Sequence, residues 1–237
     1  MKNSIRSFGV ILLCIGILYG NTLAISETSN IDTSTTLTQS ELALIIEGQY
    51  QKSESGVFYF TNVSSESTLY SIAEQPYQKK EIMAIIPLSQ EYEEQLEQEL
   101  MAIRASEDEW DFKGTSLSSA AATAYSTIYY ETGSASTGYP TVLLKKIEGH
   151  YKINASGISI TAQQVDCGCS GFRSDSGTGT ISQTHTFYPY SNNWTYYTPS
   201  SWIPIMQVDS SVSILGCWYT ITCSNGYEVE LENNLTF

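Results

Sequence analysis

The sequence predicts a mainly β protein, in which an antiparallel β-sandwich follows a small acidic α+β region and a cleaved signal peptide. Three observations predict this organisation. A short apolar run follows two basic residues at the start, acidic residues concentrate in the next part, and short alternating apolar and polar stretches fill the remainder. The predicted boundaries are 1–24 for the signal peptide, 25–40 for a flexible Ser/Thr-rich linker, 41–109 for the acidic region and 110–237 for the sandwich.

The first 24 residues have the pattern of an export signal. Lys2 and Arg6 precede an uncharged apolar run over residues 8–19. A run of this length is typical of a signal-peptide core and is too short to span a bilayer comfortably. The small residues Thr22 and Ala24 predict cleavage after Ala24, with an uncleaved anchor as the alternative. We therefore expect a secreted, extracellular protein whose mature chain has no transmembrane segment.

The charge of the chain is strongly negative and unevenly distributed. The formal net charge is −14, and removal of the two basic residues of the signal makes it −16. Nucleic acid is excluded as a partner because phosphate binding needs a basic patch. Residues 25–109 hold 16 acidic and 4 basic side chains, against 9 and 5 in residues 110–237. This asymmetry suggests two differently built regions, and the acidic region is a candidate pro-segment or solubilising collar.

The acidic region reads as a helix or strand followed by two strands and a helix. Residues 42–46 form a short apolar run of either type, residues 57–60 are typical of a strand, and residues 82–86 are typical of a buried strand. Ser89 is a plausible N-cap for a helix over residues 90–104. The apolar positions of that helix recur on one side, at Tyr92, Leu96, Leu100 and Ile103.

Short strands at regular spacing favour a sandwich beyond residue 110. The candidates are residues 125–130, 142–147, 151–153, 158–165, 180–188, 194–197, 212–221 and 227–231. The last two form the clearest hairpin, since Gly226 supplies the left-handed position of a three-residue loop. That loop pairs Ile221 with Val229 and Tyr219 with Leu231, which turns Cys217 and Cys223 inward.

Several short motifs in this region resemble a loose group of small secreted proteins from Gram-positive bacteria that have no established function. The motifs are Trp110-Asp111, the run from Ala124 to Tyr130, Gly149, and Tyr188-Pro189 with the downstream Tyr196-Tyr197. The resemblance implies secretion and transfers no catalytic residue.

Four cysteines remain after the signal peptide, namely Cys167, Cys169, Cys217 and Cys223. An even number in an exported protein predicts disulfides. Two residues six apart on one strand are roughly 20 Å apart, at about 3.3 Å per residue, so Cys217 cannot bond Cys223. We expect at least one bridge from the 167/169 pair to residue 217 or 223. A redox-active Cys-x-Cys and a four-cysteine zinc site are the alternatives.

Catalytic signatures are weak, and no cofactor is expected. By alternation His185 points to the same side as Ile181 and Phe187, as a core histidine would, and His150 is expected at an exposed turn. A nucleophilic triad would need one of these two histidines, and no nucleophile-elbow motif is present.

Carboxylate pairs for glycoside hydrolysis are defined by their positions in space rather than by their spacing in the sequence. The candidates are Asp111, Glu131, Glu148, Asp166, Asp175 and Asp209.

An aromatic run among Pro, Ser and Asn is the better binding candidate. Its proposed ligand-binding residues are Tyr188, Tyr190, Trp194, Tyr197 and Trp202. Such rings suit a protein or glycan surface, whereas alternate rings of a strand would instead fill the core. We therefore expect a non-enzymatic extracellular interaction module whose partner is a protein or a glycan. The alternative is a secreted glycan-binding protein or a polysaccharide hydrolase that uses paired carboxylates.

Overall fold

Antiparallel strands dominate the structure, which is a computed structural model that describes residues 36–64, 77–105, 116–175, 179–208 and 213–237. The predicted signal peptide and most of the predicted linker lie outside these residues. Among the residues that are described, no helix is long and apolar enough to cross a membrane. The expectation of a mainly β chain with antiparallel sheets is confirmed.

The strands form two sheets, a large one and a small one. The large sheet has the order β1 (Gln49–Lys52), β2 (Phe58–Ser64), β3 (Gln78–Pro87), β4 (Ala120–Ser134), β5 (Pro140–Ile153) and β8 (Asn193–Tyr197), and β9 (Ile205–Met206) also pairs with β5. The small sheet has the order β11 (Glu228–Thr236), β10 (Ile214–Cys223), β6 (Ile160–Phe172) and β7 (Thr180–Phe187).

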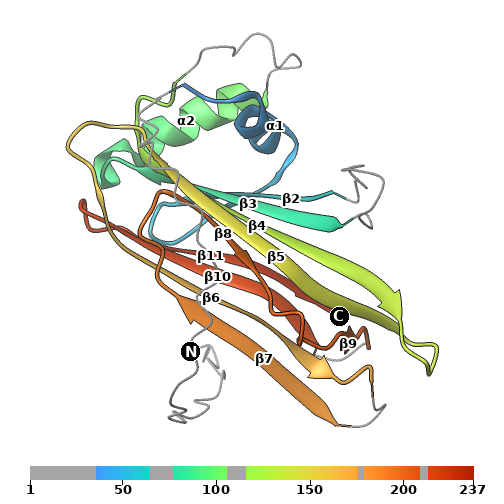
Figure 1. The fold of residues 1–237 in the computed structure, drawn as a ribbon. Coiled ribbons are helices and arrows are strands. Elements are labelled where there is room, and N and C mark those ends of the chain that lie inside the picture. The colour runs from blue at the N-terminus through green and yellow to red at the C-terminus, as the bar shows by residue number, and fades with distance from the viewer. Residues whose placement is uncertain (1–35, 65–76, 106–115, 176–178, 209–212) are drawn as a thin grey trace, which may run out of the picture.

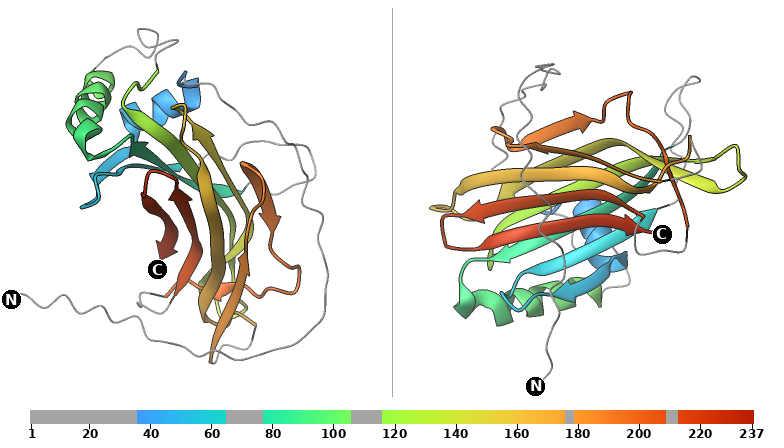
Figure 2. Two further views of the ribbon diagram at one scale, coloured as in Figure 1. Left: turned by 90° about the vertical axis from the view of Figure 1, so that its left-hand side faces the viewer. Right: turned by 90° about the horizontal axis from the view of Figure 1, so that it is seen from below.

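The two sheets pack face to face, and two helices cover part of the large sheet on its other side (Figure 1). The strand axes of the two sheets are roughly aligned (Figure 2), as in an aligned β-sandwich packing. Side chains of both sheets, among them Leu144, Tyr219 and Leu231, form the main core. A second apolar cluster joins the helices to the large sheet through residues such as Ile45, Met83 and Leu100.

Both helices form where the apolar spacing allows one buried side. The ambiguous run near residue 42 is helix α1 (Gln39–Glu47), whose N-terminus is closed by a capping box between Thr38 and Glu41. The helix predicted over residues 90–104 is a 3₁₀ turn (Gln90–Tyr92) followed by α2 (Glu93–Arg104). Its predicted buried side is present at Leu96, Leu100 and Ile103, whereas Tyr92 is exposed and the Ser89 side chain makes no capping hydrogen bond.

Strands from both sides of the composition change near residue 110 belong to the same sheet. β3 pairs with β4 along nearly its whole length, so that Met83 lies opposite Tyr125 and Ile85 opposite Thr123. The change in charge near residue 110 therefore does not coincide with a boundary between the two sheets. Instead, the glutamates of α2 differ in their surroundings. Glu94 is exposed, whereas Glu97 pairs with Lys52 of β1 at 2.7 Å and Glu99 accepts hydrogen bonds from Ser118 and Ser119.

The hairpin at the end of the chain has the predicted register. Tyr219 pairs with Leu231 and Ile221 with Val229, and Gly226 has a φ of 93°, which is left-handed. By contrast, residues 142–147 and 151–153, predicted as two strands, are one continuous strand, β5. His150 is exposed as expected, but it lies within this strand and not at a turn.

Gly149 explains the continuity of β5. Its register partner on β8 is Trp194, whose indole ring lies across the glycine. A Cβ atom at position 149 would be 2.1 Å from Cζ2 of Trp194. The glycine thus leaves room for a ring in a regular strand and does not mark a turn.

Candidate functional site

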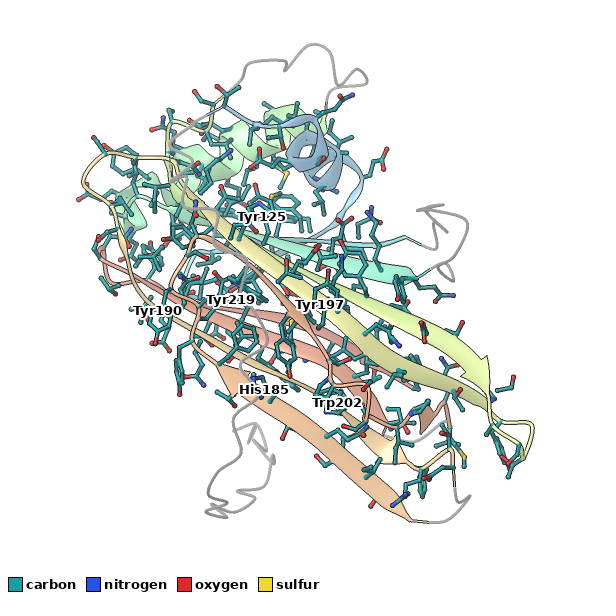
Figure 3. The ribbon with its side chains drawn as sticks, viewed as in Figure 1. Tyr125, His185, Tyr190, Tyr197, Trp202 and Tyr219 are labelled. Atoms are coloured by element: carbon teal, nitrogen blue, oxygen red, sulfur yellow. The ribbon has the colours of Figure 1, made fainter. Side chains whose placement is uncertain are left out.

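The five aromatic residues predicted to bind a ligand do not form one surface. Tyr188, Tyr190 and Tyr197 are 58%, 94% and 62% exposed, whereas Trp194 is 3% exposed and Trp202 packs, partly buried, against the core. Tyr190, Tyr197 and Trp202 lie at separate places on the molecule (Figure 3). Trp194 is a core residue, with its ring edge-on to Tyr219 at 5.0 Å between centroids. A continuous aromatic platform is therefore absent from the described residues.

His185 points to the predicted side of β7 but is exposed, and so it is not a core histidine. Its ring stacks on Tyr196 of β8, with 4.7 Å between centroids and 8° between planes. It also stacks on Phe187, at 5.8 Å. The histidine is exposed because β7 is the end strand of the small sheet, where the core meets solvent.

The predicted disulfide is absent, because all four described cysteines are free and buried. Cys167 lies directly opposite Cys217 in the β6–β10 register, but their sulfurs make other contacts. The Cys217 sulfur is 3.1 Å from the Ser126 hydroxyl of the facing sheet, and the Cys167 thiol donates to the carbonyl of His185 at 3.5 Å.

Burial also makes these thiols poor nucleophiles. It raises the pKa of Cys169 to about 11 and that of Cys217 to about 12, and it raises the pKa of Cys167 further. A thiol with a raised pKa holds its proton at neutral pH and so is a weak nucleophile and metal ligand. In the described part of the chain, no group of three or more metal-ligating side chains occurs.

The predicted carboxylates are scattered. Glu131 pairs with Lys145 at 3.4 Å and Asp175 with Arg173 at 2.7 Å. Asp166 accepts hydrogen bonds from Gln164 and Thr186 on the outer face of the small sheet. Asp111 and Asp209 lie outside the described residues. Glu148 lines a cleft of about 780 Å³.

That cleft lies on the outer face of the large sheet, beside α1. Directly paired residues of antiparallel strands share a face. The register therefore brings Glu81 of β3, Thr127 of β4, Glu148 of β5 and Thr195 of β8 into one row across the cleft. The neighbouring row holds Met83, Tyr125, His150 and Asn193. The outer face of the sheet is thus apolar where the helices cover it and polar along the rows that border the cleft.

Glu148 is held in position by two neighbours on the same face. Its carboxylate accepts a hydrogen bond from the Tyr129 hydroxyl at 2.6 Å and pairs with the Lys146 ammonium at 2.9 Å. The Lys146 nitrogen also lies over the Tyr129 ring, 3.8 Å from its centroid. Tyr197, which was predicted to bind a ligand, is the register partner of Lys146 and adjoins this group. Tyr129 and Glu148 thus line one corner of the cleft, and Lys146 holds both of them in place from beside it.

A buried ion pair closes the end of the cleft near α1. Glu41 and Lys152 are each 5% exposed, with 2.8 Å between the Lys152 nitrogen and one carboxylate oxygen. Tyr125 donates a hydrogen bond to the same carboxylate, and Lys152 donates to the carbonyl of Thr36. His150 stacks on Tyr125 at 4.0 Å between centroids. The pair therefore fixes α1, the segment before it and the large sheet to one another.

The pKa of Glu41 is lowered by this environment. Burial by itself would raise it, but hydrogen bonds from Lys152, the Thr38 amide and Tyr125, with the charge of Lys152, outweigh the burial. Glu41 is thus ionised and fully hydrogen-bonded inside the fold.

Sequence reasoning missed this ion pair and most of the residues around the cleft. One available signal was alternation: Tyr125, Thr127 and Tyr129 are two apart, as are Lys146, Glu148 and His150. The pairing of Glu41 with Lys152, 111 residues apart, has no local signal.

Comparison with protein-family models, curated proteins and solved structures found no match. The function is therefore inferred from the site. Its polar groups include carboxylates, hydroxyls, the amides of Asn192 and Asn193, an imidazole and tyrosine rings, which bind by hydrogen bonding and stacking.

Proposed function

We propose that the protein is a non-enzymatic extracellular binding module that holds a neutral glycan in the cleft on the outer face of the large sheet. The carrying observation is the row Glu81, Thr127, Glu148 and Thr195, which crosses four adjacent strands. A sugar presents hydroxyl groups that both donate and accept, so a mixed row of carboxylates and hydroxyls matches it. Rigid strands hold these groups at fixed spacing, which lowers the cost of ordering them on binding.

The charges around the cleft favour a neutral ligand. Glu81 and Glu148 line it, and each already has a lysine neighbour, Lys79 at 3.2 Å and Lys146 at 2.9 Å. The chain as a whole carries −14, so a polyanionic ligand is repelled at long range. A neutral polyhydroxylated ligand avoids this penalty.

Tyrosine rings at the margin supply the apolar contact that sugar faces need. Tyr129 and Tyr197 both flank Lys146 on this face of the sheet, and Tyr197 is 62% exposed. An exposed tyrosine offers a flat apolar face with a polar tip, which suits a partly apolar sugar ring. The predicted role of Tyr197 in binding is thus retained at a site different from that of Tyr188 and Tyr190.

Hydrolysis by paired carboxylates is the competing function. Glu81 and Glu148 lie in the same row with one strand between them, which places their Cα atoms about 10 Å apart because neighbouring strands are about 4.8 Å apart. Catalysis requires a carboxylic acid and a carboxylate flanking one bond. Glu148 is instead engaged by both Tyr129 and Lys146, which suits a fixed acceptor.

A glycan array followed by calorimetry tests the proposal. We expect the protein to bind neutral oligosaccharides without cleaving them. In calorimetry, Glu148→Gln should weaken binding about 10-fold or more, since a hydrogen bond to a charged group contributes about 1.5–3 kcal/mol. Glu131→Gln on neighbouring β4 is the matched control, because Glu131 lies outside the cleft lining, and it should leave the affinity unchanged.

Three outcomes contradict the proposal. Cleaved oligosaccharide products would establish the hydrolase instead. Binding that is insensitive to Glu148→Gln would place the ligand elsewhere. A protein that binds no glycan on the array would leave the cleft without its proposed ligand.

A further inference from the structure

We propose that the exposed edge of β7 binds the same edge of a second copy of this chain, so that two small sheets join into one continuous antiparallel sheet. This inference goes beyond the glycan-binding proposal and concerns a different surface. It rests on the position of β7, on its lack of charge and on its capacity to pair with itself.

β7 is an end strand with eight residues available for pairing. It pairs with β6 from Thr180 to Phe187, and within the described part of the chain it pairs with no other strand. In Figure 1 it lies at the border of the small sheet, away from the helices. Thr180, Ser182, Thr184 and Thr186 are exposed along its length. The outward backbone groups of such a strand are a template for pairing with another strand.

The other end strands carry protective features that β7 lacks. β11, at the opposite edge of the small sheet, exposes Glu228, Glu230 and Glu232. β1 has four residues and includes Lys52, and β8 has five residues. β7 contains no Asp, Glu, Lys, Arg or Pro, and its ladder to β6 has no bulge. Charges, proline, bulges and shortness are the usual ways to block edge pairing.

The inner side chains of β7 hold the strand in place before any partner arrives. The Gln183 side-chain amide donates to the carbonyl of Ile203 at 2.8 Å and accepts from the Ile203 amide at 2.6 Å. His185 stacks on Tyr196 of the large sheet. A strand that is already ordered loses little conformational freedom when a second strand pairs with it.

One register makes the edge complementary to itself. Residues of the two copies that share a face must lie opposite each other, which requires a twofold axis through a single residue. With the axis at Thr184, Ser182 lies opposite Thr186 of the second copy, and Ile181 lies opposite Phe187 of the second copy. Hydroxyl side chains then meet on the outer face. On the inner face Gln183 meets His185 next to the axis, and the apolar Ile181 and Phe187 meet further from it. An axis at Gln183 would instead place Ile181 opposite His185.

Charge supports a pairing confined to this edge. Two chains of net charge −14 repel each other over most of their surfaces. β7 contributes no acidic side chain, so two copies that pair along it bring no carboxylates of this strand against each other. The repulsion elsewhere limits association to a closed dimer, which the twofold axis also requires.

Light scattering on the full protein tests this proposal through its mass. We expect a mass of two chains that falls toward one chain on dilution. Thr184→Lys should shift the protein to the monomer mass, because two lysines would face each other at the axis. Thr236→Lys, an exposed threonine on the opposite edge strand β11, is the matched control and should leave the dimer intact.

Cysteine cross-linking tests the register. Thr184→Cys should form an intermolecular disulfide on mild oxidation, since the two Cα atoms at the axis would be within the limit of about 7 Å. Ser182→Cys should not, because its counterpart is displaced by four residues, about 13 Å along the strand. Thr184→Lys should keep its circular dichroism spectrum and its glycan affinity, which separates this test from that of the cleft.

A monomer at every soluble concentration would overturn the proposal. So would a dimer that survives Thr184→Lys, or cross-linking that favours position 182 over 184. If the edge is instead covered by another protein, the chain alone stays monomeric and both cysteine variants stay uncross-linked.

Discussion

The two faces of the large sheet are built from the same strands but differ in chemistry. The inner face meets the small sheet along its length and is almost entirely apolar, with Ile128, Leu144 and Ile147 fully buried. The outer face is covered by α1 and α2 near Phe60 and Met83, and beyond the helices it carries polar side chains beside a cleft.

This difference shows how the sheet separates stability from recognition. Strand alternation sends every second side chain to each face, so one strand such as β4 contributes Ile128 to the core and Thr127 to the cleft. The inner face is fixed mainly by apolar packing, whereas the part of the outer face that borders the cleft is fixed by hydrogen bonds and one buried ion pair. Substitutions on the two faces should therefore affect different properties.

The largest expected effect comes from the ion pair under α1. Lys152→Ala leaves the Glu41 carboxylate buried with no cation, and we expect the free energy of unfolding to fall by about 3–5 kcal/mol. Denaturant titration measures this change. Lys145→Ala, which removes a partly exposed partner of Glu131, is the control and should cost less than about 1 kcal/mol. A loss for Lys152→Ala as small as that of the control would show that the pair does not hold α1 in place.

A smaller effect is expected from crowding the inner face. Gly149→Ala would place a Cβ atom 2.1 Å from the Trp194 ring, so the ring must move within a packed core. We expect a loss of about 1–3 kcal/mol, with a change in tryptophan fluorescence. Gly133→Ala on β4 is the matched control, because its nearest contact is a Thr141 side-chain oxygen at 3.1 Å. Equal stability of the two variants would contradict the close packing of Trp194 on Gly149.

Acid should weaken the outer face through Glu41. The folded-state pKa of Glu41 is lowered, so its contribution to stability is complete above the unfolded pKa and is lost as the pH falls through the folded value. Stability of the native protein should therefore decline as the pH falls below about 5, where unfolded glutamate, with a pKa of about 4.3, begins to bind protons. The double variant Glu41→Gln with Lys152→Met should show a shallower decline, measured by thermal unfolding across this range. Identical pH profiles would remove Glu41 as the cause.

The smallest effect on stability is expected at the open part of the cleft. Tyr129→Phe removes a hydrogen bond to Glu148 from a partly exposed site and should cost about 0.5–1.5 kcal/mol. For each variant, the loss of glycan affinity can be compared with the loss of stability. This ratio should be larger for Tyr129→Phe than for Gly149→Ala. A variant that lost stability and left the affinity unchanged would place Tyr129 among purely structural residues.

Local signals in the sequence predicted local features of the fold. The Cys223–Tyr227 hairpin was predictable because loop length, Gly226 and alternation all indicate one register. β5 was predicted as two strands because a glycine in the sequence can indicate either a turn or a strand position that a large ring covers. Gly149 is of the second kind, beneath Trp194. The position of Cys167 opposite Cys217 depends on pairing between β6 and β10, and whether two facing thiols bond depends on the groups around each sulfur.

The candidate site was harder to predict because it combines residues from four strands and a helix. Glu148 was among the predicted carboxylates and Tyr197 among the predicted aromatic residues, but each belonged to a different hypothesis. The row that joins Glu81 to Thr195 exists only through strand order, since β8 pairs with β5 across an intervening stretch of chain that holds β6 and β7. No periodicity along the chain reports that pairing.

The most direct test of the account is a nuclear magnetic resonance titration with a neutral oligosaccharide that binds on the array. We expect amide shift changes concentrated at Thr127, Glu148 and Thr195, while Val165 and Leu231 in the core remain unchanged. Changes centred on Tyr188 and Tyr190, or no saturable change at the cleft, would contradict it.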